Sequence, residues 1–227
     1  LPFLIGARYR SGLLKRRSAG LHKKDEHLSK LGFLGISGDG ASFCVPVSPD
    51  DKRLVKAMLN SAGDKKKVVI SPGSKSHLKM WSARKFARLS DSLVKEFGCA
   101  VFVIGNEDDR AAVNKMISSV EYPVQDLCCG TTIGMIAELM KHAALVITND
   151  SAPLHIASAV GAPTLAVFGP SDEKKYGPLS PKNMVISPRR KCRPCGKALC
   201  SKGPVEGCIS DISEEEVFKA AASLLGA

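Results

Sequence analysis

Three features are scarce or absent in this chain: aromatic residues, long apolar runs and the glycine-rich motifs of common nucleotide-binding proteins. Three Tyr and one Trp among 227 residues leave few rings on which nucleic-acid bases could stack. No apolar stretch approaches the ~20 residues that cross a bilayer as a helix. No Gly-x-Gly-x-x-Gly follows an expected strand, and no Gly-x-x-x-x-Gly-Lys-Ser/Thr occurs. These absences argue against a nicotinamide dehydrogenase and a P-loop NTPase.

Basic residues outnumber acidic ones, 33 to 22, which gives a formal net charge of +11. A basic run extends from Arg8 to Lys30, and Lys65–Lys67 forms a second run. Such runs are most often solvated surface, yet the excess favours an anionic partner such as a phosphorylated lipid, a membrane surface or nucleic acid. With 44% hydrophobic residues, the chain can form one sizeable core with appendages.

Residues 149–155, Asn-Asp-Ser-Ala-Pro-Leu-His, follow an apolar run and begin a short helical stretch. The pattern predicts a helix N-terminus at the end of a parallel strand, where unpaired N–H groups bind anions. Pro153 suits the first helical position. Asp150 and His155 are the polar groups that can face a ligand. In the structural alternative, Asp150 or Ser151 only caps the helix and His155 packs against the core.

A second segment joins a strand to a polar turn. Val68–Gly73 reads as a strand that runs into a turn, followed by Ser74, Lys75 and Lys79. Backbone N–H groups and ammonium groups at such a turn can bind a diphosphate. The alternative for any single lysine is a solvated surface residue.

The amphipathic helix expected over residues 82–97 follows this turn. Ser82 is expected to cap the helix, and Trp81 is expected to pack on Phe86 as a hydrophobic staple. Trp81 therefore reads as structural.

Two further polar turns follow expected strand ends. Asn106–Arg110 comes after the buried strand Val101–Gly105, and an acid at that place can accept hydrogen bonds from ribose hydroxyls. Acids in a first helical turn also favour the helix dipole without any ligand. Gly130–Thr132 precedes a helix whose apolar face is expected to carry Ile133 and Ile136.

Between residues 66 and 168, strands and helices alternate with short connections. This order predicts a doubly wound, Rossmann-like α/β domain with a mostly parallel sheet. The polar segments at 73–79, 105–109, 130–131 and 149–155 all follow strand ends. Because ligands bind beyond the carboxyl ends of such strands, we expect these segments to form one site.

The string from Asp150 to Pro170, Asp-Ser-Ala-x-x-His-x-Ala-x-Ala-x-Gly-x-Pro-x-x-Ala-x-Phe-Gly-Pro, resembles glycosyltransferase family 9, the bacterial lipopolysaccharide heptosyltransferases. Pro72-Gly73 followed by Lys79-x-Trp81 agrees with the same family at its usual spacing. Ala152 replaces the usual glycine, which leaves less room for close backbone approach. The resemblance covers most of residues 66–225. It implies the C-terminal, donor-binding half of a GT-B glycosyltransferase, in which two Rossmann-like domains face a cleft.

The resemblance also implies an activity: inverting transfer of heptose from ADP-L-glycero-D-manno-heptose to the inner core of lipopolysaccharide, with no metal needed for transfer. Lys79 and the helix N-terminus after Asp150 would stabilise the departing ADP. Asp150 would orient the sugar or the turn, and His155 would donate to a phosphate oxygen. Asp109 would contact the ribose, and Thr131 would line the adenine pocket unless it only caps the next helix. The expected donor-binding residues are Ser74, Lys75, Lys79, Asp109, Thr131, Asp150, Ser151, Ala152 and His155.

Residues 1–60 resemble the family only loosely, as the last part of its N-terminal acceptor domain and a linker, whereas residues 61–227 correspond to the nucleotide-sugar-binding domain. A strand over Arg8–Gly12 and a helix around Leu28–Leu34 are expected. In the family the N-terminal half carries the general base, so the catalytic residue here is unknown. The chain thus reads as a fragment of a longer enzyme or as a truncated gene product. Three acids read as exposed loop residues: Asp39, Asp50 and Asp51.

Four of the eight cysteines cluster in a Gly- and Pro-rich loop over 192–208. In a reducing compartment such thiols indicate structural zinc or an iron–sulfur cluster before disulfides, although their spacing matches no standard zinc finger. The loop, which leads into a helix expected over 213–225, resembles heptosyltransferase II, and this implies a structural role near the cleft. The clustered residues are Cys192, Cys195, Cys200 and Cys208. The others, Cys44, Cys99, Cys128 and Cys129, read as buried small apolar groups.

Two other functions compete with this interpretation. A non-catalytic nucleotide-sugar-binding remnant would bind donor without transfer. A basic, metal-bearing nucleic-acid-binding module fits the charge and the cysteines but shows no recognisable motif. We therefore expect a nucleotide-sugar donor and an anionic glycolipid acceptor, the lipid A inner core, as partners, and no nucleic acid. The expected location is the cytoplasm, with peripheral contact at the inner membrane as an extension of that prediction.

Overall fold

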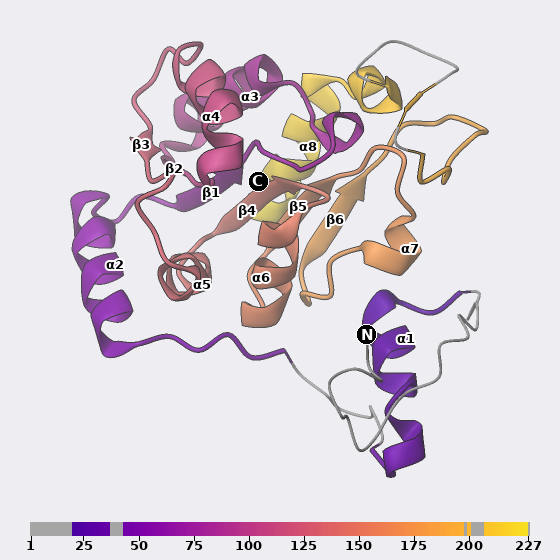
Figure 1. Cartoon of the computed structure of the whole chain (residues 1–227). Helices are drawn as coiled ribbons and strands as arrows, with labels where there is room; N and C mark the ends of the chain where they lie inside the picture. Colours follow the sequence, from indigo (N-terminus) through magenta and orange to yellow (C-terminus); the bar gives the residue numbers. More distant parts are fainter. Residues whose placement is uncertain (1–19, 37–42, 198, 201–206, 227) are drawn as a thin grey trace. The chain divides into compact units, whose positions relative to one another are not determined.

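The computed structural model describes residues 20–36, 43–197, 199–200 and 207–226 (Figure 1). Contacts divide the chain into two compact units. The N-terminal unit comprises residues 1–42 with Lys174–Tyr176, and the sheet unit comprises Phe43–Glu173 with Gly177–Ala227. Residues 43–60, which the sequence analysis grouped with the N-terminal remnant and linker over residues 1–60, lie in the sheet unit. No helix among the described residues is both long and apolar enough to cross a membrane.

The described part of the N-terminal unit contains helix α1 (Lys23–Ser29) and the 3-10 turn η1 (Gly32–Leu34). The helix expected around residues 28–34 thus begins earlier, because the ring nitrogen of His22 caps it by accepting from the Lys24 N–H. A hydrogen bond from Lys23 lowers the pKa of Glu26 to about 2. The strand expected over residues 8–12 lies outside the described residues.

The sheet unit is built on six parallel strands in the order β3-β2-β1-β4-β5-β6. This order confirms the doubly wound, Rossmann-like sheet. β6 was not predicted, because the expected alternation of elements ended at residue 168. The strands are β1 (Lys67–Ser71), β2 (Ala100–Val103), β3 (Gln125–Asp126), β4 (Leu145–Asn149), β5 (Thr164–Val167) and β6 (Asn183–Ile186).

Helices cover both faces of this sheet (Figure 1). One face packs against α3 (Ala83–Phe97), α4 (Arg110–Ile117) and α8 (Glu214–Leu225). The other packs against α2 (Pro49–Ser61), α5 (Ile133–Lys141) and α6 (Ala152–Val160). The short elements are η2 (His77–Lys79), η3 (Glu107–Asp109), α7 (Glu173–Tyr176) and η4 (Gly207–Asp211).

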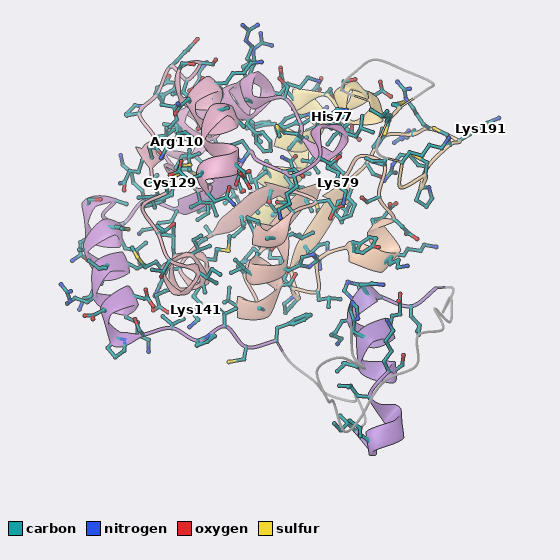
Figure 2. All side chains as sticks on the ribbon, viewed as in Figure 1. His77, Lys79, Arg110, Cys129, Lys141 and Lys191 are labelled. Carbon is teal, nitrogen blue, oxygen red and sulfur yellow. The ribbon has the colours of Figure 1, made fainter. Side chains whose placement is uncertain are left out.

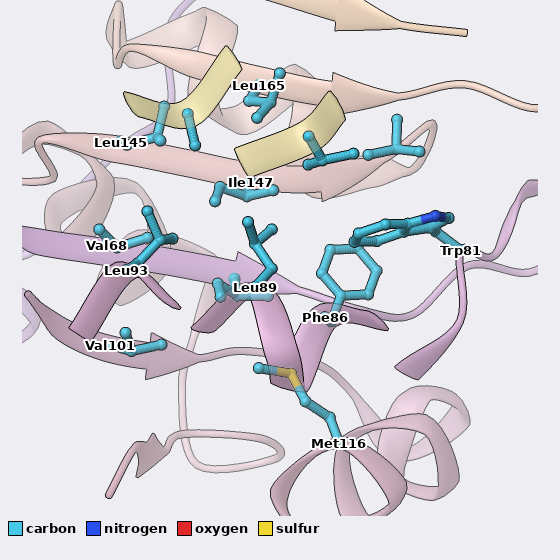
Figure 3. Close-up of a cluster of buried hydrophobic side chains, with 14 of the residues drawn as sticks. Val68, Trp81, Phe86, Leu89, Leu93, Val101, Met116, Leu145, Ile147 and Leu165 are labelled. Carbon is cyan, nitrogen blue, oxygen red and sulfur yellow. The ribbon is translucent and has the colours of Figure 1, made fainter. Parts of the chain in front are cut away.

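Alternating side chains of the strands build the two cores. Val68 and Ile70 of β1 join the cluster under α3, whereas Val69 points to the opposite cluster under α5. This follows from the two-residue period of a strand. Figure 3 shows the first cluster, in which Phe86 and Leu89 of α3 lie against the sheet.

The start of α3 is fixed by an aromatic pair. The Trp81 ring packs edge-on against Phe86 at a centroid distance of 4.9 Å, which confirms the expected staple. The Trp81 ring N–H donates to the Ile212 carbonyl at 3.1 Å. Ser82 occupies the N-cap position, but its side chain makes no capping hydrogen bond, so that part of the prediction was wrong. Because its donor and its ring are both used, Trp81 is a structural residue.

Helix α2 corrects the prediction for two acids. Asp50 and Asp51 lie in its first turn, not in a loop. Ser48 caps the helix, and the Asp51 carboxylate completes the capping box by accepting from the Ser48 N–H at 3.0 Å. Val55 of this helix is buried in the core under α5. Asp39 lies outside the described residues.

Candidate functional site

The order in which successive strands are added to the sheet reverses between β1 and β4: β2 and β3 lie on one side of β1, and β4, β5 and β6 lie on the other. β1 pairs with β2 on one side and with β4 on the other. Loops that leave two such neighbouring strands in opposite directions open a crevice beyond their carboxyl ends, which is where doubly wound sheets bind ligands. The segment after Ser71 and the segment after Asn149 border this crevice.

Asn149 holds the two sides of the crevice together, and the sequence analysis did not single it out. The residue is fully buried. Its side-chain oxygen accepts from the Trp81 N–H at 3.1 Å, and its side-chain nitrogen donates to the Pro72 and Gly73 carbonyls at 2.9 and 3.2 Å. A polar amide at the last position of an otherwise apolar strand was the signal that could have identified it.

Lys79 and Asp150 form an ion pair at the end of this network (Figure 2). Lys79 Nζ lies 2.7 Å from Asp150 Oδ2, and the carboxylate side chain is only 5% exposed while the lysine side chain is 33% exposed. The buried acid therefore fixes an ammonium group at the edge of the crevice. An ammonium carries three N–H donors, so Lys79 can donate to a bound anion while it stays paired with the Asp150 carboxylate.

A cavity of about 430 Å³ collects most of the predicted site residues. Its lining includes six of the nine expected donor-binding residues, which come from four strand ends. The six are Ser74, Lys75, Asp109, Thr131, Ser151 and Ala152. Lys79, Asp150 and His155 are not among the lining residues.

Asp109 takes the structural role that the sequence left open, and its expected ribose contact stays a prediction. Its carboxylate accepts from the Asn106 N–H at 3.1 Å in a capping box, and it also lines the cavity. The other carboxylate oxygen faces Gly73, since a Cβ placed on that glycine would meet Asp109 Oδ1 at 1.9 Å. The glycine therefore permits the close approach of the β1 turn to this acid.

Thr131 was expected either to line the adenine pocket or to cap the next helix, and the cap is made by its neighbour Thr132 instead. Thr132 caps α5, since its hydroxyl accepts from the Met135 N–H at 3.0 Å and donates to Asp51 at 2.6 Å. The prediction that Thr131 caps this helix was wrong. Its hydroxyl is buried in the cavity wall without a hydrogen-bond partner in the described part of the chain. A ligand atom at this place would satisfy it.

Ile133 also differs from the prediction. It was expected on the core face of α5, but it is 65% exposed and lines the cavity. The reason is its place at the first position of the helix, beyond the edge of the sheet that the later turns cover. Together with Ile104, Ile136 and Ile156 it gives the cavity an apolar wall suited to a flat ring.

The N-terminus of α6 carries no side-chain cap from Ser151, which instead bonds back toward Thr148 and Asn149 at 3.3 and 3.4 Å. The capping alternative for Ser151 is thus not realised. Ala152 takes the first helical position and Pro153 the second, one place later than predicted. The first turn of α6 therefore borders the cavity with no side-chain cap from Ser151, and the expected anion site at this N-terminus stays a prediction. His155 is exposed on this helix.

The cysteine loop borders a separate cavity of about 230 Å³, which all four clustered thiols line. No three His, Cys, Asp or Glu side chains within the described ranges come close enough to hold a metal ion. Gly207 of the loop lies against Leu78, the residue before Lys79. The loop therefore packs on the segment that carries the ion pair. Of the other cysteines, Cys99 and Cys128 are buried as expected, whereas Cys44 and Cys129 are exposed.

The profile of glycosyltransferase family 9 (heptosyltransferase) matches residues 42–206. The chain belongs to this family. Lipopolysaccharide heptosyltransferase 3 of Escherichia coli (strain K12) is 32% identical over 162 residues, which cover 70% of this chain and 47% of that protein. Lipooligosaccharide heptosyltransferase 2 of Campylobacter jejuni is 26% identical over 167 residues, 71% of this chain and 51% of that protein. The family 9 chain thus spans about half the length of these curated relatives.

Solved structures agree with the family 9 fold. The glycosyl transferase family 9 protein from Veillonella parvula DSM 2008 superposes with a TM-score of 0.79 at 25% identity, over 98% of this chain and 65% of that one. E. coli ADP-heptose lps heptosyltransferase II gives a TM-score of 0.64 at 24% identity, over 80% and 53% of the two chains. Both similarities confirm a Rossmann-like part of the GT-B architecture.

Proposed function

We propose that this chain carries the donor site of a heptosyltransferase and binds ADP-heptose in the cavity beyond β1, β2 and β3. The observation that carries the proposal is the cavity lining, in which an acid, an apolar wall and a buried hydroxyl that has no partner among the described residues lie together. Adenine would lie on the wall formed by Ile133, with Thr131 at its polar edge. Asp109 would accept from a ribose hydroxyl.

The diphosphate would lie between the turn after β1 and the N-terminus of α6. Backbone N–H groups at both places and the ammonium of Lys75 would donate to its oxygens. Lys79, held by Asp150, would stabilise the charge that grows on ADP as the bond to the anomeric carbon breaks. His155 would reach a phosphate oxygen from the exposed side of α6. These donors neutralise the leaving group without a metal ion.

The proposed reaction is inverting transfer of heptose to the inner core of lipopolysaccharide. We place the general base that deprotonates the acceptor hydroxyl outside the 227 residues of this chain. An anionic glycolipid acceptor is compatible with the net charge of +11. The proposed location is the cytoplasm with peripheral contact at the inner membrane, and nucleic acid is not a partner in this scheme.

Calorimetric titration of the folded chain with ADP tests the donor site directly. We expect saturable binding of ADP and weaker binding of UDP, because the cavity wall selects the base while the diphosphate contacts are shared. Circular dichroism would establish that the same sample is folded. Folded protein that takes up no ADP even at millimolar ligand would contradict the proposal.

A transfer assay separates an enzyme from a nucleotide-sugar-binding protein that does not transfer, which is the second candidate because the chain spans about half the length of its relatives. With the base placed elsewhere, we expect this chain to bind ADP-heptose and to transfer negligible heptose to a lipid A-core acceptor. Robust transfer that is abolished by Asp50→Asn or Asp51→Asn would place the base within the chain instead.

A further inference from the structure

Two neighbouring cysteines lie where the nucleotide cavity meets the end of β3. Cys128 is buried and Cys129 is exposed, and Cys129 lines the cavity. The two sulfur atoms are 3.5 Å apart. The backbone of Cys129 has a φ of +62°, which side-chain-bearing residues rarely adopt, and its N–H donates to the Gly105 carbonyl at 2.9 Å. This conformation turns both thiols toward the same side of the chain.

Arg110 completes the arrangement. Its guanidinium donates to Asp126 at 2.8 Å and to the Cys128 carbonyl, and a hydrogen bond to the Cys129 side chain raises the pKa of Arg110. Figure 2 shows Arg110 beside Cys129. A cationic group next to a sulfur stabilises the thiolate, which is the form that reacts as a nucleophile.

The two thiols are not equivalent. Burial, together with the hydrogen bond to Cys129, raises the pKa of Cys128 to about 12. Its sulfur lies 3.4 Å from the Asn106 carbonyl oxygen. Cys128 therefore stays protonated beneath the surface, whereas Cys129 meets solvent and any molecule that enters the cavity.

We propose that Cys129 and Cys128 form a thiol–disulfide exchange site in the wall of the nucleotide cavity, with small disulfides as its substrates. The Cys129 thiolate attacks one sulfur of the disulfide, a mixed disulfide forms, and the first small thiolate leaves and takes up a proton. The Cys128 sulfur then attacks the Cys129 sulfur, the bond between Cys129 and the small thiol breaks, and the Cys128 proton passes to the second small thiolate as it leaves. Two cysteine thiols are oxidised to one disulfide, and the small disulfide is reduced to two thiols.

The mixed disulfide on Cys129 places the small thiol's group in the cavity that Thr131 also lines, so it should exclude the nucleotide. This consequence rests on the proposed donor site, whereas the exchange chemistry does not. Because both processes use the same wall, bound ADP should in turn shield Cys129.

Peptide mapping measures the exchange without interference from the other thiols. A tryptic digest gives the peptide Met116–Lys141, which contains these two cysteines and no other, while Cys44 falls in the peptide Leu31–Lys52 as an exposed control. After treatment of the folded chain with dithiodipyridine, the first peptide should lose the mass of two hydrogens. Cys128→Ser should stop at the pyridyl mixed disulfide on Cys129, and Cys129→Ser should give neither product.

ADP protection tests the location of the site. At about ten times its dissociation constant, ADP should slow modification of Cys129 about tenfold and leave Cys44 unaffected. If ADP binds the reduced chain but Met116–Lys141 stays unmodified while Cys44 reacts, the exchange site is refuted. Equal modification of Cys129 with and without bound ADP would refute its place in the nucleotide cavity. If ADP does not bind the reduced chain but the exchange proceeds, the donor site fails and the thiol chemistry stands.

Discussion

At position 73 the backbone passes so close to Asp109 that a side chain has no room. A Cβ there would meet the Asp109 carboxylate at 1.9 Å and its Cβ at 2.7 Å. Gly73→Ala should therefore displace Asp109 and weaken ADP binding about tenfold or more, as expected for loss of a hydrogen bond to a charged group. Gly130→Ala is the matched control, because its nearest neighbour lies at 3.8 Å.

A double-mutant cycle assigns that loss to Asp109. Because Asp109→Ala removes the atoms that clash, Gly73→Ala should cost no further affinity in the Asp109→Ala background. Isothermal titration of the four proteins with ADP provides the measurement. Full additivity of the two losses would mean that the glycine acts through another contact.

Among the proposed donor-binding residues, Lys79 should contribute most to binding of the negatively charged diphosphate. Lys79→Ala should reduce ADP affinity by about ten- to a hundredfold, because a diphosphate carries its charge before and during the reaction. In an active heptosyltransferase the same change should slow transfer by ~10² to 10³. Lys141→Ala, at an exposed position of α5, should leave both unchanged. Undiminished ADP binding by the Lys79→Ala chain would remove Lys79 from the donor site.

At the scale of elements, two adjacent threonines precede α5. We expect Thr131 to contribute to ADP binding and Thr132 to contribute to the stability of the helix. Thr132→Val should lower the free energy of unfolding by about 1 kcal/mol through loss of the cap and should leave ADP affinity nearly unchanged. Thr131→Val should weaken ADP binding and leave the free energy of unfolding nearly unchanged, since its hydroxyl has no partner within the described residues. Urea denaturation and ADP titration of both variants would measure this. A loss of ADP affinity confined to Thr132→Val would invert the assignment.

Asp51 links α2 to α5 in a way that depends on pH. Hydrogen bonds from the Thr132 hydroxyl and from Ser48 lower the pKa of Asp51 below its ordinary value of 3.8. The stability that this acid contributes is therefore present above that value and is lost as the pH falls through the lowered pKa. Asp51→Asn should flatten the acid side of the stability profile measured by urea denaturation. Asp50→Asn, at an 83% exposed side chain, should not.

At the scale of the whole molecule, the charge of +11 is the dominant feature. The chain should sediment with vesicles that contain anionic lipid and not with purely zwitterionic vesicles. Binding should weaken as ionic strength rises, because salt screens charges separated by more than about 10 Å at 0.1 M. Equal sedimentation with both kinds of vesicle at low salt would contradict an electrostatic membrane contact.

Most of the sheet was predictable because β1, β2, β4 and β5 are largely apolar and are each followed by a polar turn. Parallel strands covered on both faces give this pattern, and the turns carry the ligand groups by topology alone. The segments that carry Lys79, Asp109 and Asp150 could therefore be located from their positions after strands, whereas the choice of these residues within them also used the family resemblance. Topology predicts only which segments follow the strand ends and does not predict the contacts that their side chains make.

The remaining features depend on contacts between distant segments. Asn149 bonds to residues 68 or more positions away, so no local pattern marks it as the centre of the crevice. Ile133 satisfies the helical period of a core residue, and only the limit of the sheet leaves it exposed. Cys129 is turned outward by its positive φ, a property that its side-chain chemistry does not predict.

The groups proposed to contact the base and the lysines proposed to contact the diphosphate belong to different turns of the chain, and this separation matters for evolution. Thr131 and Ile133 follow β3, whereas Lys75 and Lys79 follow β1. If the proposed donor site is correct, substitutions in the turn after β3 would change which base is accepted, while the diphosphate contacts after β1 would stay unchanged. Descendants of such a protein can therefore exchange one nucleotide preference for another in single steps, each of which still binds a donor.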